Sequence, residues 1–314
     1  MKKFAISLAL SACAAFGQTK QICLTIDDLP VVSYGVSDTS IQSGVMNRLL
    51  RTLVREHIPA IGFVNERKLY DSSGSLPFQV SLLERWIDGG MELGNHTYSH
   101  PDFNSVSCTD FFSDVIRGET VTKDLLRKRG KPLRYFRHPF LHVGNTKEKA
   151  DSLSTFLAER GYIVVPVTVD NDDYLFAVVY HRARMKRDTA SAVRIGRDYV
   201  VYMRDKLQYY EREATALFGR PIAQTLLMHA SRLNADHLDE LVAMIRENGY
   251  QFVDPETVLN DDVYRTPVTV YRNFGISWLD RWALSQGKPG SFFKDEPDVP
   301  AYIREGAKLG LVPN

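Results

Sequence analysis

Short apolar runs alternate with amphipathic stretches along most of this chain, and that alternation restricts the fold more than any other feature. Seven runs have the length and composition of buried strands: residues 21–26, 60–65, 91–94, 134–137, 162–169, 225–228 and 250–253. Stretches with helical spacing of apolar residues lie between them: 40–57, 78–87, 110–129, 148–160, 175–220 and 235–248. Repeated strand–helix alternation predicts a parallel sheet, because each helix returns the chain to the start of the next strand. We therefore expect an α/β fold, and specifically a closed or nearly closed β/α barrel.

Two segments depart from this rhythm. Residues 175–220 predict one or two inserted helices ahead of the strand at 225–228, and their tyrosines could either line a sugar groove or pack in the core. The tyrosines considered are Tyr202, Tyr209 and Tyr210. Residues 260–314 predict an extension with little regular structure that packs back onto the barrel through apolar side chains. The side chains expected to do so are Trp278, Leu279 and Trp282. The prediction is one catalytic domain, residues 18–259, followed by a C-terminal extension, residues 260–314.

The N-terminus has the pattern of a secretory signal peptide. Lys2 and Lys3 precede the apolar run 4–12, and small residues continue to Gly17. We predict that residues 1–17 are a signal peptide, too short for a permanent membrane span. Residues 10–13 also resemble a bacterial lipobox, which would place a lipid on Cys13, so cleavage after Gly17 and lipidation at Cys13 both remain open. Either route predicts export to the periplasm, the cell envelope or the exterior, with no transmembrane segment.

The charge balance argues against a nucleic-acid partner. Lys and Arg number 39 against 38 Asp and Glu, for a formal net charge of +1. A protein that binds nucleic acid or an anionic membrane surface through its overall charge needs a clear basic excess.

Polar residues follow the apolar runs where the predicted strands end. They are Asp27, Asp28, His96, His100, Arg137, Asp170, Asp173 and His229. In a β/α barrel the carboxyl ends of the strands carry the active site, so these side chains are expected to converge. One carboxylate with two histidines is typical of a catalytic metal site that keeps positions open for water. A second carboxylate could take a proton from that water, and a histidine across the cleft could protonate a leaving group, as in a hydrolase.

Taken singly, each of these features has an ordinary structural explanation. His96 and His100 would share a face on a helical turn and could reach one metal ion, but they could also be surface residues at a helix start. Asp27 and Asp28 could belong to a turn or a helix cap. His229 alone would more often be a satisfied core histidine. Their common position after apolar runs is what favours a site.

Five segments resemble the five ordered motifs of polysaccharide deacetylases, the NodB-homology proteins of carbohydrate esterase family 4. They are TIDD at 25–28, HTYSH at 96–100, RHPF at 137–140, DNDDY at 170–174 and LLMH at 226–229. Each motif is weak alone, whereas five in the same order are a specific signal. The resemblance covers about residues 20–255. It implies a distorted (β/α)7 barrel and metal-dependent removal of acetyl groups from polysaccharides. The helical insertion predicted at 175–220, before the last catalytic strand, is longer than a minimal deacetylase needs.

The resemblance also implies roles for the charged residues. Asp27 resembles the catalytic base, and Arg137 resembles the arginine that orients the carboxylate of that base. His229 resembles the acid that protonates the leaving group, and Asp173 resembles the carboxylate that polarises it. Asp170 opens the same motif as Asp173 and is a further catalytic candidate.

A second set of roles concerns the metal and the substrate. The resemblance implies that one divalent ion, usually Zn²⁺ and sometimes Co²⁺ or another metal, is bound by three residues: Asp28, His96 and His100. The predicted substrate contacts are Tyr98, Pro139, Phe140, His142 and Tyr174. Tyr174 stands where the family usually has tryptophan, which puts the width of the acetyl pocket in doubt. For His142, a solvated loop histidine is the favoured alternative to a substrate contact. A backbone N–H between residues 98 and 100 is expected to stabilise the oxyanion.

We interpret the chain as an N-deacetylase of an amino-sugar polymer such as peptidoglycan or chitin, with the acetylated glycan as its partner. The first alternative is an O-acetyl esterase acting on acetylated xylan or a similar glycan. An alternative of another class is an inactive carbohydrate-binding barrel.

Overall fold

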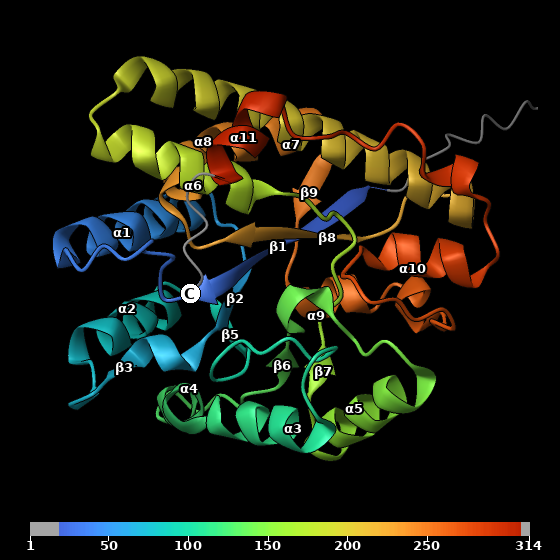
Figure 1. The fold of residues 1–314 in the computed structure, drawn as a ribbon, viewed down its shortest axis with the longest axis horizontal. Coiled ribbons are helices and arrows are strands. Elements are labelled where there is room, and N and C mark those ends of the chain that lie inside the picture. The colour runs from blue at the N-terminus through green and yellow to red at the C-terminus, as the bar shows by residue number, and fades with distance from the viewer. Residues whose placement is uncertain (1–18, 309–314) are drawn as a thin grey trace, which may run out of the picture.

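A curved sheet of parallel strands forms the centre of the molecule in the computed structural model, which describes residues 19–308 (Figure 1). Its strands run in the order β7-β6-β5-β2-β1-β8, and β9 pairs beside β1. Their bounds are β1 Lys20–Leu29, β2 Ala60–Val64, β5 Glu92–Asn95, β6 Tyr135–Phe136, β7 Ile163–Val164, β8 Gln224–His229 and β9 Tyr250–Phe252. A separate small hairpin joins β3, Tyr70–Asp71, to β4, Gly74–Ser75. The predicted α/β fold with parallel strands is confirmed.

The sheet closes on itself through the chain that follows β7. The strand predicted at 162–169 is divided, because Pro166 lies in its middle and has no N–H to donate to a neighbouring strand. Residues before Pro166 pair with β6, whereas Thr168 and Val169 both donate backbone N–H groups to the Thr225 carbonyl of β8. Val169 also forms a bridge with Leu226. The result is a distorted barrel rather than a regular one.

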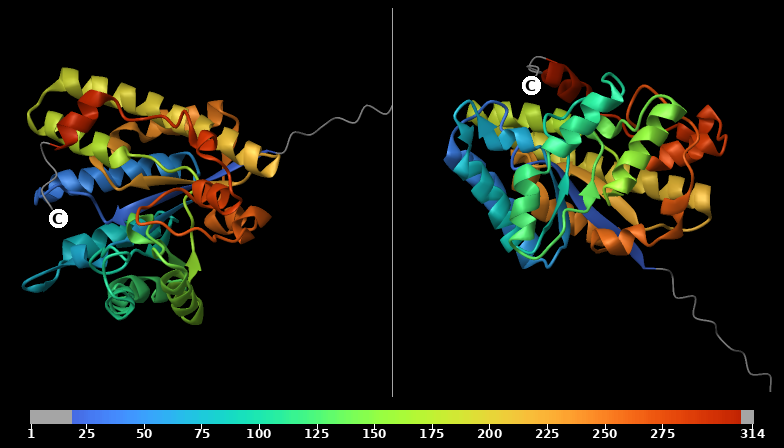
Figure 2. Two further views of the ribbon diagram at one scale, coloured as in Figure 1. Left: turned by 45° about the vertical axis from the view of Figure 1, so that its right-hand side comes forward. Right: turned by 90° about the horizontal axis from the view of Figure 1, so that it is seen from below.

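Helices surround the barrel, as the views in Figure 2 make clear. They are α1 Thr39–Arg55, α2 Pro77–Asp88, α3 Cys108–Arg117, α4 Thr120–Arg127, α5 Lys147–Glu159, α6 Asp173–Met185, α7 Thr189–Phe218, α8 Arg232–Glu247, α9 Pro255–Leu259, α10 Trp278–Ser285 and α11 Ala301–Lys308. The single helix predicted at 110–129 is wrong, since α3 and α4 are separated at Gly118. A Cβ at Gly118 would lie 2.6 Å from the carbonyl carbon of Thr97, so this break lets the helix pair approach the backbone of the second motif.

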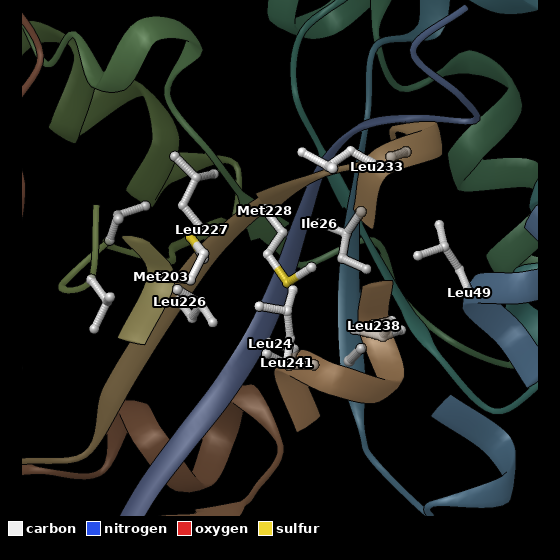
Figure 3. Packing of buried hydrophobic residues seen from close by; sticks show 14 of the residues in the cluster. Leu24, Ile26, Leu49, Met203, Leu226, Leu227, Met228, Leu233, Leu238 and Leu241 are labelled. Atoms are coloured by element: carbon white, nitrogen blue, oxygen red, sulfur yellow. The ribbon is translucent and has the colours of Figure 1, made fainter. Parts of the chain in front are cut away.

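The alternation of side chains along β1 divides the core from the interior of the barrel. Ile22, Leu24 and Ile26 pack outward against the helices, and Figure 3 shows Leu24 and Ile26 among apolar residues of α1, α8 and β8. Cys23 lies in a separate apolar cluster inside the barrel with residues of β2 and β6. Because successive strand residues point to opposite faces, Asp27 continues the inward column that begins at Cys23.

The insertion and the extension both pack on the barrel. The helical insertion is present as α6 and α7, and Tyr202, Tyr209 and Tyr210 are buried, so they belong to the core rather than to a groove. The expectation of little regular structure after residue 260 is wrong, because α10 and α11 lie there. Trp278 donates its backbone N–H to the Val167 carbonyl at 2.7 Å, and the Trp282 ring packs against Phe218.

The predicted signal peptide, residues 1–17 with Cys13, lies outside the described residues. Between residues 19 and 308, no helix is both long enough and apolar enough to cross a bilayer.

Candidate metal and catalytic site

A β-bulge at the end of β1 turns two consecutive carboxylates toward the same side. Ile26 pairs with Gly62 and Leu29 pairs with Val64, so β1 contains one residue more than β2 over this interval. Asp28 has φ of 67°, in the left-handed region. In a regular strand Asp28 would point away from Asp27, but a bulge re-aims the side chain. The ammonium group of Lys68 holds the bulge, because it donates to the Asp28 carbonyl at 2.9 Å and lies 3.6 Å from Asp28 Oδ1.

His96 and His100 lie on an irregular turn, so the helical turn proposed for them is wrong. Thr97 and His100 have φ values of 66° and 58°, and residues 96–100 form no helix. The turn is held by its own side chains, since Asn95 Oδ1 accepts from the Thr97 N–H at 2.6 Å and Thr97 Oγ1 accepts from the His100 N–H at 3.0 Å. This backbone path brings the two imidazole rings to 4.7 Å between centroids.

Asp28, His96 and His100 fit a divalent metal ion. Their potential ligand atoms lie within 4.8 Å of one another, and no other such cluster occurs within residues 19–308. Nδ1 of His96 lies 2.9 Å from the Arg137 carbonyl, which makes Nδ1 the protonated nitrogen and leaves the lone pair of Nε2 facing the cluster. Asp28 Oδ1 is buried and accepts no hydrogen bond, as expected of an oxygen kept for a cation.

The charge states of Asp28, His96 and His100 also suit metal binding. Burial lowers the pKa of His96 and of His100 to about 4, so both rings are neutral and can act as ligands. Burial acts to raise the pKa of Asp28, but Lys68 and the neighbouring histidines outweigh it and hold that pKa well below the usual range. The cluster therefore offers two neutral nitrogens and one carboxylate.

Asp27 lies between this cluster and a buried arginine. Its Oδ2 is 3.8 Å from His96 Nε2, and its Oδ1 is 3.7 Å from Arg137 Nε. Arg137 is fully buried at the end of β6 and donates through Nη2 to Thr25 Oγ1 at 2.7 Å. Burial raises the pKa of Asp27 despite the opposing effect of Arg137. A carboxylate with a raised pKa beside a metal cluster is well placed to accept a proton from water.

His229 forms a charged pair with Asp173, the first residue of α6. Its Nδ1 lies 2.6 Å from Asp173 Oδ1, while Asp173 Oδ2 accepts from the His229 N–H at 2.9 Å and from Asn234 Nδ2 at 2.6 Å. Burial alone would lower the pKa of His229, but the contact with Asp173 overrides it and raises that pKa to about 9. His229 is paired in register with Asp27 across β8 and β1, so an imidazolium stands beside the carboxylate.

Asp170 and Tyr174 belong to the same motif as Asp173, but of the two only Tyr174 contacts His229. Asp170 Oδ1 accepts the N–H of Asn171, and burial raises the pKa of Asp170 to about 7. The Tyr174 ring is 44% exposed and meets the His229 ring edge-on at 6.4 Å. Tyr174 thus forms an exposed aromatic surface on the His229 side of the site.

The remaining predicted substrate contacts divide into two groups. Phe140 is 53% exposed and its ring lies 4.5 Å from that of His100, on the metal side of the site, whereas Pro139 is buried beneath it. His142 is not a free loop histidine, since its Nδ1 lies 2.5 Å from Asp102 Oδ1. The Tyr98 ring is covered by the Arg117 guanidinium at 3.6 Å, so it contacts protein rather than an open cleft.

The backbone N–H groups expected to stabilise an oxyanion are already engaged. The N–H groups of Tyr98 and Ser99 donate to Asp114 Oδ1 at 2.9 and 2.8 Å, and that of His100 donates to Thr97 Oγ1. The expectation drawn from the resemblance is therefore not met by this geometry, because Asp114 and Thr97 satisfy the same donors.

Comparison with known proteins identifies related sequences and structures. Residues 17–154 match the sequence profile of the family described as polysaccharide deacetylase. Over this stretch the chain resembles the polysaccharide deacetylase family, carbohydrate esterase family 4. The chitin deacetylase of Colletotrichum lindemuthianum is 30% identical over 128 residues, which are 40% of this chain and 47% of that protein. An uncharacterised protein of Geobacillus stearothermophilus is 22% identical over 234 residues, or 74% of this chain and 73% of that protein. The chain thus spans about half the length of the chitin deacetylase.

Solved structures share the fold at low identity. The family-4 pseudoenzyme BA3943 of Bacillus anthracis superposes with a TM-score of 0.51 at 16% identity, covering 77% of this chain and 66% of that one. The peptidoglycan N-acetylglucosamine deacetylase Bc1960 superposes with a TM-score of 0.50 at 17% identity, covering 77% and 88%. A protein described as a pseudoenzyme and one described as a deacetylase thus share this fold, and the fold alone does not decide between the two.

Three residues that hold the site in place were assigned no role from the sequence, although Thr25 is the first residue of the TIDD motif. Lys68 holds the bulge at Asp28, Thr25 holds Arg137, and Asn234 links Asp173 to the His229 carbonyl at 2.8 Å. Each is an ordinary residue for its local element, so its contact with the site depends on the tertiary fold.

Proposed function

We propose that this chain is a metal-dependent deacetylase that hydrolyses acetamide groups on N-acetylated amino-sugar polysaccharides of the peptidoglycan or chitin type. One observation carries the proposal. A proton acceptor, Asp27, and a cationic proton donor, His229, are paired in register beside the Asp28, His96 and His100 cluster. This is the combination that hydrolysis of an amide requires.

The roles of the residues follow from their charge and contacts. A divalent ion, Zn²⁺ or a similar metal such as Co²⁺, would be held by Asp28, His96 and His100 and would supply Lewis acidity toward water and the acetyl carbonyl. Asp27 accepts a proton from the attacking water, because burial has raised its pKa. Arg137 lies 3.7 Å from Asp27 Oδ1 and limits the orientations of that carboxylate.

The leaving group receives its proton from His229, on the other side of the site from the metal ligands. His229 delivers its proton to the departing amine nitrogen as the carbon–nitrogen bond breaks, giving acetate and a free amino sugar. Asp173 fixes the ring of His229 through Nδ1, so Nε2 is the nitrogen that faces the substrate. The exposed rings of Phe140 and Tyr174, which lie beside His100 and His229, are suited to contact the sugar on either side of the reacting acetyl group.

We also propose that the protein is exported, since residues 1–17 have signal-peptide character and the proposed substrates occur outside the cytoplasm. The proposal covers both cleavage after Gly17 and lipid attachment at Cys13. Mass spectrometry of the mature N-terminus distinguishes the two routes.

Acetate release is the direct test. The protein, stripped of metal and reconstituted with Zn²⁺ or Co²⁺, is incubated with chito-oligosaccharides, peptidoglycan and acetylated xylan, and acetate is measured for each. We expect release from the N-acetylated substrates, dependent on added metal and absent in Asp27→Asn. Release from acetylated xylan alone would assign the O-esterase activity instead. Glycan binding without acetate release at saturating metal would assign an inactive carbohydrate-binding barrel.

A further inference from the structure

The turn that carries Phe140 has a backbone conformation that its residues do not favour. Phe140 and Leu141 have φ values of 55° and 54°, two successive left-handed residues without glycine. Side chains with a Cβ are disfavoured in this region because the Cβ crowds the backbone. Such a conformation persists only where surrounding structure holds it. The turn itself contains just two short-range backbone bonds, from Leu141 N–H to the His138 carbonyl at 3.1 Å and from His142 N–H to the Pro139 carbonyl at 3.0 Å.

The C-terminal extension supplies the additional contacts. Gly275 lies directly against the turn, because a Cβ built on Gly275 would collide with the Phe140 carbonyl oxygen and approach Leu141 Cβ to 3.1 Å. Arg281, which is 1% exposed, donates through Nη2 to the Leu141 carbonyl at 2.8 Å. Both left-handed residues are therefore contacted by one segment, residues 275–281, which lies about 140 positions further along the chain.

This segment is itself anchored to the barrel. Trp278 donates its N–H to the Val167 carbonyl at 2.7 Å, next to the point where the sheet closes. The centroids of the Trp278 and His138 rings are 6.0 Å apart in a stacked arrangement. The Arg281 guanidinium lies 5.3 Å from the centroid of the Trp278 ring. Leu279 and Trp282 are fully buried. A rigidly anchored segment can therefore impose a conformation on a turn that would otherwise relax.

The constrained turn affects the candidate metal site through one side chain, that of Phe140. Phe140 is the residue whose backbone is constrained, and its exposed ring stands 4.5 Å from that of His100. If the turn relaxed to ordinary φ values, the ring would leave this position while His100, which belongs to a different loop, would stay.

We propose that residues 275–281 act as a substrate-positioning strap, in which Gly275 and Arg281 hold the turn at 139–141 so that Phe140 presents its ring to the sugar beside the metal site. The proposal rests on the proposed deacetylase function for the identity of the substrate. It assigns to the C-terminal extension, which lies beyond the region matched by the family profile, a part in substrate binding.

The position of the turn is tested without reference to activity. Amide hydrogen exchange is measured for residues 138–144 in Gly275→Ala and Arg281→Met, with Gly290→Ala and Arg265→Met as matched controls. Gly290 has open space for a Cβ, and the Arg265 side chain is 68% exposed. We expect faster exchange at Leu141 and His142 in the two strap variants only, with Arg281→Lys intermediate because it retains a donor. Unchanged exchange in both strap variants, with both folded by circular dichroism, overturns the proposal whatever the enzyme acts on.

Kinetics then test the consequence for substrate. With triacetylchitotriose, we expect KM to rise about tenfold in Gly275→Ala and Arg281→Met, the effect of losing roughly one aromatic contact, while kcat and zinc content stay close to wild type. Phe140→Ala should raise KM similarly, and combining it with Gly275→Ala should add little, because the strap acts through this ring. Additive effects would contradict the proposal. Faster exchange in the strap variants together with no acetate release by the wild type would instead count against the deacetylase function alone.

Discussion

Replacing Asp173 by asparagine gives the sharpest test of the site, because this carboxylate sets the charge of His229. The ordinary pKa of histidine is 6.5, and the contact with Asp173 raises that of His229 to about 9 against the opposing effect of burial. The difference corresponds to roughly 3 kcal/mol in favour of the imidazolium. Without the carboxylate charge of Asp173, the pKa of His229 should fall, because burial lowers it and only the smaller effects of Asp28 and Asp27 still raise it. The side-chain oxygen of asparagine can still accept from the His229 N–H and from Asn234 Nδ2, which both donate to Asp173 Oδ2, so the local fold should persist.

The shift also has a defined effect on stability. Because the folded pKa lies above the unfolded value, the pair stabilises the protein fully below about pH 6.5 and loses this contribution as the pH rises through about 9. In urea unfolding of the wild type, the contribution of this pair to the free energy of unfolding should be up to roughly 3 kcal/mol smaller above pH 9 than at pH 6. The Asp173→Asn variant should lack that dependence.

The assay is NMR titration of the His229 ring in metal-free protein, assigned by comparison with His229→Gln, followed by turnover of the zinc-loaded enzyme. We expect kcat to fall by about 10²–10⁴ in Asp173→Asn, because a neutral imidazole is a poor acid for an amine leaving group. Glu240→Gln is the matched control, since Glu240 Oε2 pairs with His237 Nδ1 at 2.6 Å away from the site. A His229 ring that titrates at the same pH in the wild type and in Asp173→Asn would refute the reasoning.

Two further predictions concern the metal. Asp27→Asn should lower acetate release by about 10²-fold or more and still bind the metal, whereas His96→Ala should lose both acetate release and bound metal. Elemental analysis measures the metal content of the two variants. Equal metal content in both would contradict the assignment of Asp27 as a base rather than a ligand. Gly118→Ala places a Cβ 2.6 Å from the Thr97 carbonyl carbon, so it should weaken zinc affinity and cost about 1–3 kcal/mol of stability by denaturant unfolding, while Gly290→Ala should change neither. Wild-type zinc affinity in Gly118→Ala would show that the 96–100 turn does not depend on this close approach.

Much of the architecture was determined by the sequence, because it depends on local periodicity. Alternating apolar residues of β1 place Asp27 inside the barrel, and helical spacing predicts α1, α2, α5 and α8 to within a few residues. The order of the five motifs likewise predicted which strand ends would carry charged residues. These features follow from the sequence because successive residues of a strand point to opposite faces, and because a helix with one apolar stripe can be placed in few ways.

The tertiary structure decided how those residues meet. The bulge that turns Asp28 toward Asp27 depends on pairing with β2, and the irregular turn of His96 and His100 replaced the helical geometry that their spacing suggests. Lys68 and Asn234 joined the site through contacts across 40 and 61 positions of sequence. Backbone conformation at these points is set by distant partners rather than by local preference, and no periodic pattern records it. The same reason explains why an extension expected to have little structure instead holds the turn beside the metal site.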